Sequence, residues 1–176
     1  MNEVIPLLPG DLEAPVVIIQ HMPAGFTHSL AERLNQISHL AVKEAQPGDA
    51  LDVGQALLAP GGFHMILDDN ARIALNQKPP VHGVRPAVDV SLTSIVQQYG
   101  KSVISVILTG MGRDGTNGSV LLHSAGGHVI AEDESSCVVW GMPRSVVEAG
   151  VVDEIIPLSQ MATAIEHAVK ARLGSS

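Results

Sequence analysis

The chain has few residues of the kinds that bind nucleic acids or form disulfides. Among its 176 residues, aromatic side chains make up 2%, and 10 Lys and Arg stand against 18 Asp and Glu, which gives a formal charge of −8. Bases stack on aromatic rings and phosphates bind positive charge, so we expect no nucleic-acid partner. The single cysteine, Cys137, excludes an intrachain disulfide framework and a cysteine-rich metal site.

Long apolar runs are also missing. No stretch reaches the roughly 18 apolar residues that a membrane span requires, and the first residues lack the basic and apolar regions of a signal peptide. We therefore expect no membrane insertion and a cytoplasmic location. Hydrophobic residues make up 45% of the chain and charged residues 16%, a composition that predicts one folded domain with a sizeable core.

Short apolar runs alternate with amphipathic stretches along the chain. Residues 14–20 and 102–108 are typical of strands buried on both faces, and helical spacing follows each of them. The further elements expected are strands at 40–45, 55–59, 128–131 and 154–156, a hairpin of 63–67 with 71–75, and helices near 26–37, 88–99, 116–125, 143–150 and 159–169, the last capped by Ser159. This alternation predicts an α/β fold with a doubly wound, mostly parallel sheet, helices on both faces and one β-hairpin.

Two polar segments directly follow buried strands. One contains His21, and the other is the glycine-rich turn 110–115, which contains Asp114. The carboxyl ends of parallel strands share one edge of a sheet, where ligands bind, so the two side chains are candidates to meet there. A His beside an Asp fits a general base with its orienting carboxylate. A His bound by loop backbone and an Asp that caps the next helix fit the same pattern.

The glycine-rich turn has a second interpretation. Gly110, Gly112 and Gly115 match the spacing of a dinucleotide-binding loop between a strand and a helix. Glu132 and Asp133, at the end of the next strand, lie where a ribose-binding acid would be. The negative charge of Asp114 beside a pyrophosphate argues against this interpretation. Nucleotide binding therefore stays the weaker alternative.

Other motifs indicate no metal or cofactor site. The sequence lacks a nucleophile elbow, a P-loop and a zinc-binding H-E-x-x-H pair. Cys137 lies next to Val138 and Val139, which favours a buried, inert thiol. Arg85 and Asp89 are expected to form a local ion pair. Four histidines lack the spacing of metal ligands and are expected to be structural or on the surface: His64, His82, His123 and His128.

Five separated segments together resemble one family, the catalytic (C-terminal) domain of the chemotaxis protein-glutamate methylesterase, CheB. The resemblance extends in order from about residue 3 to about residue 167. The segments are QHMPAGF (20–26), APGGFHM (59–65), RPAVDV (85–90), ILTGMGRDG (107–115) and CVVWGMPR (137–144).

The resemblance implies a carboxylic ester hydrolase with a Ser-His-Asp triad. The substrates it implies are γ-glutamyl methyl esters, and certain glutamines, on the methylated cytoplasmic helices of chemoreceptors. The motifs assign the catalytic histidine to His21, the aspartate to Asp114 and an oxyanion-binding backbone N–H to the vicinity of Met111. No metal and no organic cofactor are implied.

One family feature is missing from the sequence. The nucleophile of the family is the serine of a Gly-Ala-Ser-Thr-Gly-Gly turn that follows a first strand, and no such turn occurs here. We therefore expect residues 1–176 to form an N-terminally incomplete catalytic domain, without a receiver domain and inactive as given. A base and its orienter cannot form an acyl-enzyme without a nucleophile.

Three explanations of the missing turn are open. The first is truncation or a misassigned start codon in a competent enzyme, which the retained His21 and Asp114 favour. The second is a catalytically dead module of the same fold that binds receptors or other partners. The third is a rewired hydrolase that uses Ser29, Ser135 or Ser136. An absent strand predicts a gap in the sheet, or a dimer that covers it.

Overall fold

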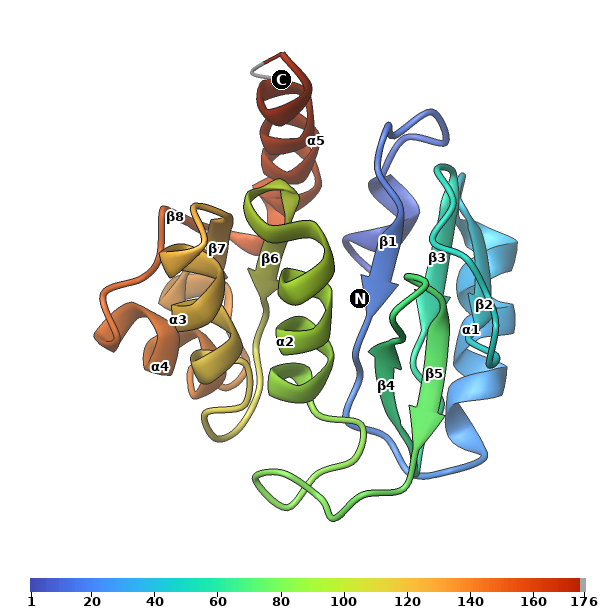
Figure 1. Ribbon diagram of the computed structural model, residues 1–176. Coiled ribbons are helices and arrows are strands. Elements are labelled where there is room, and N and C mark those ends of the chain that lie inside the picture. Colours follow the sequence, from blue (N-terminus) through green and yellow to red (C-terminus); the bar gives the residue numbers. More distant parts are fainter. Residues whose placement is uncertain (175–176) are drawn as a thin grey trace.

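Two parallel sheets of three strands each form the centre of the molecule (Figure 1). The structure, a computed structural model, describes residues 1–174. The first sheet has the order β1-β3-β2, with β1 at Val16–Ile18, β3 at Gln55–Leu58 and β2 at Ala41–Glu44. The second has the order β6-β7-β8, with β6 at Ile104–Ile107, β7 at His128–Glu132 and β8 at Glu154–Ile156. An antiparallel hairpin joins β4 (His64–Leu67) to β5 (Ile73–Asn76).

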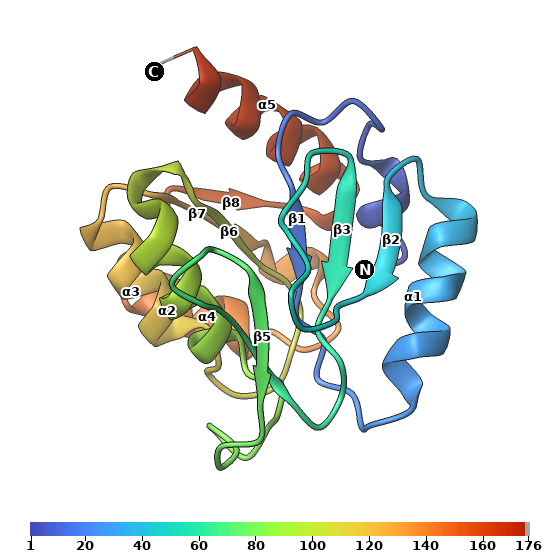
Figure 2. The same ribbon diagram turned by 45° about the vertical axis from the view of Figure 1, so that its right-hand side comes forward.

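Helices cover both faces of the sheets, as expected for a doubly wound fold. The α-helices are α1 (Phe26–Ile37), α2 (Val88–Tyr99), α3 (Thr116–Ser124), α4 (Met142–Glu148) and α5 (Met161–Leu173). Four short 3₁₀ helices occur at Ile5–Leu7 (η1), Gly100–Ser102 (η2), Glu134–Ser136 (η3) and Leu158–Gln160 (η4). Figure 2 shows α1 on the other side of the first sheet from the group of α2, α3 and α4.

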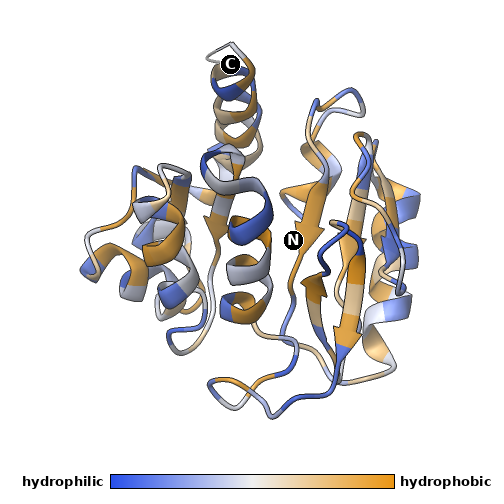
Figure 3. Cartoon of the chain, viewed as in Figure 1, coloured by the Kyte–Doolittle hydropathy of each residue, from blue (hydrophilic) through white to orange (hydrophobic). Residues whose placement is uncertain are grey.

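The central strand of the second sheet, β7, is buried on both faces, and its successive side chains point in opposite directions. In β7, Val129 packs with Leu92 of α2 and Leu122 of α3. The next residue, Ile130, packs instead with Met161 of α5. Figure 3 shows the result as strands that are hydrophobic along most of their length.

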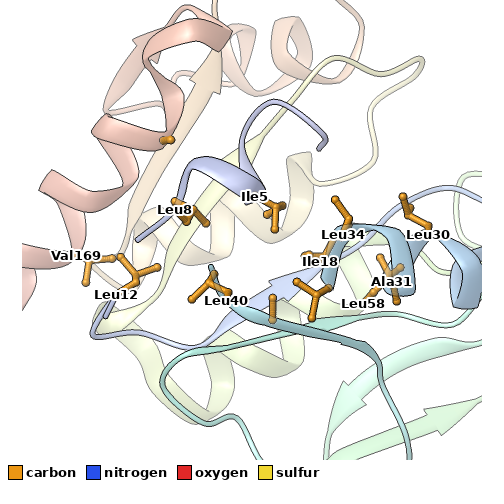
Figure 4. Close-up of a cluster of buried hydrophobic side chains, with 13 residues drawn as sticks. Ile5, Leu8, Leu12, Ile18, Leu30, Ala31, Leu34, Leu40, Leu58 and Val169 are labelled. Carbon is orange, nitrogen blue, oxygen red and sulfur yellow. The ribbon is translucent and has the colours of Figure 1, made fainter. Parts of the chain in front are cut away.

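The first sheet follows the same rule with different partners. On one face, Ile18 and Leu58 pack with Leu34 of α1 in a cluster that also contains Val169 of α5 (Figure 4). The other face is covered by the β4–β5 hairpin, because Leu57 belongs to the cluster of the hairpin side chains. The predicted strands, hairpin and helices of this half are therefore confirmed.

The two sheets are not joined by strand pairing. Within residues 1–174, β1 pairs with β3 alone and β6 with β7 alone, so each sheet has one unpaired edge on the side of the other (Figures 1 and 2). The N-terminal segment packs across this break. Val4 belongs to the cluster of β6, β7 and α5, whereas Ile5 and Leu8 belong to the cluster of β1 and α1. The predicted break in the sheet is confirmed.

Two details differ from the sequence-based expectations. Ser159 does not cap the last helix, since it lies inside η4 and α5 begins after Gln160 without a side-chain cap. The helical spacing that includes Phe26 and Ile37 is correct for α1, but both of these end residues are exposed, because only the middle of the helix reaches the sheet. No helix among residues 1–174 has the length and apolar character needed to cross a membrane.

Candidate active site

His21 and Asp114 meet at the carboxyl edge of the sheets. His21 follows β1 by three residues and Asp114 lies in the turn between β6 and α3. The Nε2 atom of His21 lies 2.7 Å from Oδ2 of Asp114, so the proximity predicted from the strand order is confirmed. An ionised carboxylate only accepts hydrogen bonds, so Nε2 carries the proton and donates it. In the neutral form of the ring, Nδ1 is then the nitrogen that carries the lone pair and can act as a base.

The carboxylate of Asp114 is held by the first turn of α2. Oδ2 accepts the backbone N–H of Val88 at 2.7 Å, and Oδ1 accepts that of Asp89 at 2.9 Å. Burial by itself raises the pKa of Asp114, which is only 2% exposed, but the hydrogen bonds from His21, Asp89 and Val88 outweigh it and lower the pKa below its usual value. Asp114 is therefore anionic at neutral pH and keeps the His21 ring oriented.

Helices α2 and α3 cap each other. Asp114 precedes α3 and binds the N–H groups of α2, while Asp89 lies on α2 and accepts the N–H of Gly118 in the first turn of α3 at 2.8 Å. Neither helix has a side-chain cap at its own N-cap residue, Ala87 or Gly115. The expectation that Asp114 caps the helix after its own turn is thus wrong, because it caps α2 instead.

Two glycines allow this close approach. Gly115 has a φ of +94°, and a Cβ there would lie 2.9 Å from Cδ1 of Ile107. A Cβ on Gly118 would lie 2.9 Å from Leu92 in α2. Gly115 therefore serves the packing of the turn against β6, and Gly118 the packing of α3 against α2.

The turn before Asp114 presents free backbone donors. Gly110 is fixed, since its N–H donates to Val139 at 3.0 Å and its carbonyl accepts the N–H of Met142 at 2.8 Å. The next residue, Met111, has a side chain that is 81% exposed, and its N–H has no acceptor within residues 1–174. A free N–H on a fixed loop beside Asp114 is what an oxyanion hole needs.

None of the serines considered as substitute nucleophiles is bound to His21. Ser135 bonds Asp133, and the hydroxyl of Ser136 donates to Glu132 at 3.0 Å. Ser29 is exposed on α1. Within the part of the chain that the structure describes, Asp114 is the hydrogen-bond partner of His21.

Several other residues lie differently from the expectation. Arg85 does not pair with Asp89, because its Nη1 donates to the carbonyls of Gln77 and Lys78 and Asp89 binds His82. Cys137 is half-buried rather than buried. Burial and the nearby Glu132 raise its pKa to about 11, so the thiol is protonated and unreactive at neutral pH.

The other histidines have mostly structural partners. His64 is buried and binds the carbonyl of Pro79, and His128 binds Glu154. His82, Asp89 and Asp114 bring potential metal-ligating atoms within 4.8 Å of one another. Those atoms already form the hydrogen bonds described above, so we assign no metal to them.

Comparison with known proteins identifies the family. The model of the CheB methylesterase family matches residues 1–165. The chain belongs to the CheB methylesterase family. The crystal structure of the Thermotoga maritima CheB methylesterase catalytic domain superposes with a TM-score of 0.90 at 44% identity, over 94% of this chain and 89% of that one. The family resemblance inferred from the five motifs and the α/β fold inferred from the alternation of strands and helices are thus confirmed.

Relatives at the sequence level are named protein-glutamate methylesterase/protein-glutamine glutaminase. One from Symbiobacterium thermophilum is 54% identical over 96% of this chain and 47% of its own length. Another, from Pyrococcus horikoshii, is 42% identical over 96% of this chain and 46% of its own length. The chain therefore spans about half the length of these relatives, which are carboxylic ester hydrolases by name.

Sequence reasoning missed His82 and the N–H pair of Val88 and Asp89. The segment RPAVDV was part of the family resemblance, but the sequence offered no reason to place its backbone against Asp114. The one local signal near His82 was Gly83, since glycine after it suits the second position of a two-residue turn.

Proposed function

We propose that this domain hydrolyses γ-glutamyl methyl esters, and deamidates certain glutamines, on the methylated cytoplasmic helices of chemoreceptors. The observation that carries the proposal is the 2.7 Å contact between His21 and Asp114 at the carboxyl edge of the sheets. Membership of the CheB methylesterase family and relatives named for both reactions support it. A cytoplasmic location is part of the same proposal, since the substrate helices lie there.

The reaction is acyl transfer to a serine. His21 accepts the serine proton at Nδ1 while its Nε2–H stays bonded to Asp114, and the serine oxygen attacks the ester carbonyl. The Met111 N–H stabilises the oxyanion, a contribution of about 3 kcal/mol for a well-placed donor. The imidazolium then gives this proton to the leaving methoxide oxygen as the C–O bond breaks, and methanol departs. Water attacks the acyl-enzyme by the same route and releases the glutamate.

The mechanism also needs a nucleophilic serine next to His21, and no serine among residues 1–174 is bonded to His21. We propose that this nucleophile belongs to a Gly-Ala-Ser-Thr-Gly-Gly turn at the end of a strand that pairs with β1 and β6. Two observations support this position. The facing edges of β1 and β6 are unpaired within residues 1–174, and a strand between them ends at the same edge as His21. Residues 1–174 alone are then inactive.

The alternative is a module that kept the fold and binds receptors or other partners without catalysis. The free Met111 N–H and the anionic Asp114 favour the esterase, because a binding module needs neither.

The test is to extend the chain at its N-terminus with a strand that ends in this turn. Methanol release from methylated receptor is then measured for the chain as given, for the extended protein, and for an extended protein with Ala in place of the added Ser. We expect turnover only in the extended protein with Ser, together with a higher melting temperature for both extended proteins, because the strand fills the break.

Two results would contradict the proposal. Turnover by the unextended chain that disappears on Ser29→Ala or Ser135→Ala would establish a rewired site. An extended protein that is well folded and more stable, yet inactive, would favour the binding module.

A further inference from the structure

A second His–Asp pair lies beside the first. Nε2 of His82 is 2.8 Å from Oδ2 of Asp89, a carboxylate that is only 6% exposed. The other oxygen of Asp89 accepts the N–H of Gly118. The catalytic chemistry proposed above does not use His82, so its place in this cluster needs a reason.

The backbone of His82 is in an unfavourable conformation. His82 has a φ of +54° and Gly83 a φ of +78°, and the residues on either side, Val81 and Val84, bond each other through their backbones. This is a two-residue turn of the kind that favours Asn, Asp or Gly at its first position. The contact between the His82 ring and Asp89 compensates for this conformation.

The loop that carries His82 is anchored at its base. The buried His64 donates from Nε2 to the carbonyl of Pro79 at 3.1 Å. Nη1 of Arg85 donates to the carbonyls of Gln77 and Lys78, each at 3.0 Å. These contacts fix the base of the loop, so that His82 lies in one place against Asp89.

Asp89 connects the two pairs. Its side chain lies between His82 and Gly118, while its backbone N–H is bonded to Asp114. Asp89 is therefore held by its side chain on one side and bonded to Asp114 by its backbone on the other. We propose that His82 is a positioning residue for the His21–Asp114 pair, acting through Asp89 and the first turn of α2. The effect of His82 on catalysis rests on the function proposed above. Its effect on the position of Asp114 and His21 does not.

The tautomer of His21 provides a direct readout. In the native chain the ¹⁵N shifts of His21 should show a proton on Nε2 and none on Nδ1, with a slowly exchanging Nε2 proton bonded to Asp114. His82→Asn preserves the turn, because Asn suits a positive φ, but its shorter side chain does not reach Asp89. We expect the His21 shifts to move toward the average of the two tautomers and the Nε2 proton to exchange about tenfold faster, the size of one net hydrogen bond.

A matched control is His28→Asn, which removes a histidine that is 67% exposed on α1 and pairs with Glu32 and Glu44. This change should leave the His21 spectrum as it is. A second variant, Asp89→Asn, keeps an oxygen for Gly118 and an amide that can meet His82. If His82 acts by holding the Asp89 side chain in place, and the charge of Asp89 is not needed, this variant should keep the native His21 tautomer.

The outcomes are distinct. An unchanged His21 spectrum in His82→Asn, with a shifted Gly118 amide, would overturn the proposal and leave His82 as a support of α3 alone. In the extended protein, a lower kcat at unchanged KM for His82→Asn would agree with positioning. If that protein is inactive while the His21 tautomer still responds to His82→Asn, the proposed function fails and the positioning stands.

Discussion

The two His–Asp pairs have the same chemistry but different surroundings. In both, Nε2 of the histidine meets a buried carboxylate, and the carboxylate binds the first turn of a helix: Asp114 that of α2, and Asp89 that of α3. His21 follows a buried strand, and its partner shares a turn with the free N–H of Met111. His82 lies at the tip of a hairpin turn. A short His–Asp contact alone thus does not distinguish the proposed catalytic pair; the place of His21 at the sheet edge and the nearby free N–H of Met111 do.

The largest expected difference between the pairs is in activity. In the extended protein, we expect His21→Gln to lower kcat by about 10³-fold or more, since removing a triad member leaves little beyond binding and the oxyanion hole. His82→Asn should lower it only about tenfold, because one supporting hydrogen bond is lost. The measurement is methanol release under saturating receptor. Equal losses for both variants would mean that the two pairs act as a single catalytic unit.

In contrast to activity, the free energy of unfolding should depend about equally on the two pairs. Asp114→Ala and Asp89→Ala each leave helix N–H groups without an acceptor in a buried setting. We expect each to lower the free energy of unfolding by about 2 kcal/mol, measured by urea denaturation. His28→Asn on the exposed face of α1 is the control and should be within about 0.5 kcal/mol of the native chain. A large loss for only one aspartate would show that the reciprocal capping is unequal.

Much of this comparison was accessible from the sequence. Buried β-branched runs place β1 and β6, and the rule that parallel strands share a carboxyl edge brings His21 to Asp114 across the sheets. The role of Asp89 was not accessible, because its spacing from Arg85 suggests an ion pair and nothing local indicates that the Arg85 side chain turns back to the loop carbonyls. Mutual capping depends on how two helices approach, which is a property of tertiary packing.

The glycine between the helices allows a test of that packing. A Cβ at Gly118 would lie 2.9 Å from Leu92, so Gly118→Ala should push α3 away from α2 and lengthen the contact with Asp89. We expect a loss of about 1–2 kcal/mol in unfolding free energy from overpacking, together with weaker protection of the Gly118-position amide from hydrogen exchange. The control is Ser124→Ala, at the exposed end of α3. A second glycine such as Gly25 would not serve, because its φ of +89° makes an alanine there strained. A fully stable Gly118→Ala would show that α2 and α3 have room to adjust.

The smallest expected effect is that of acid on the His21–Asp114 pair. Protonation of Asp114 at low pH should reduce the contribution of this pair to stability. The pKa of Asp114 is lowered in the folded state, because its hydrogen bonds outweigh its burial. Its contribution to stability is therefore fully present above the unfolded-state pKa of about 3.9 and is lost as the pH falls through the lower folded-state pKa. The difference in unfolding free energy between the native chain and Asp114→Asn should shrink from pH 5 toward pH 2. A difference that is constant with pH would mean that Asp114 has the same pKa in both states.

The cluster in Figure 4 has a consequence for synthesis on the ribosome. Val169 and Ala162 of α5 complete the same core as Leu12, Ile18 and Leu58, which are translated more than 100 residues earlier. The first half of the chain therefore leaves the exit tunnel with this core covered by α1 but not by α5, and the part that α5 covers stays open until α5 has emerged. During that interval, nascent β1 and its neighbours present an apolar face and an open strand edge to chaperones and to other nascent chains.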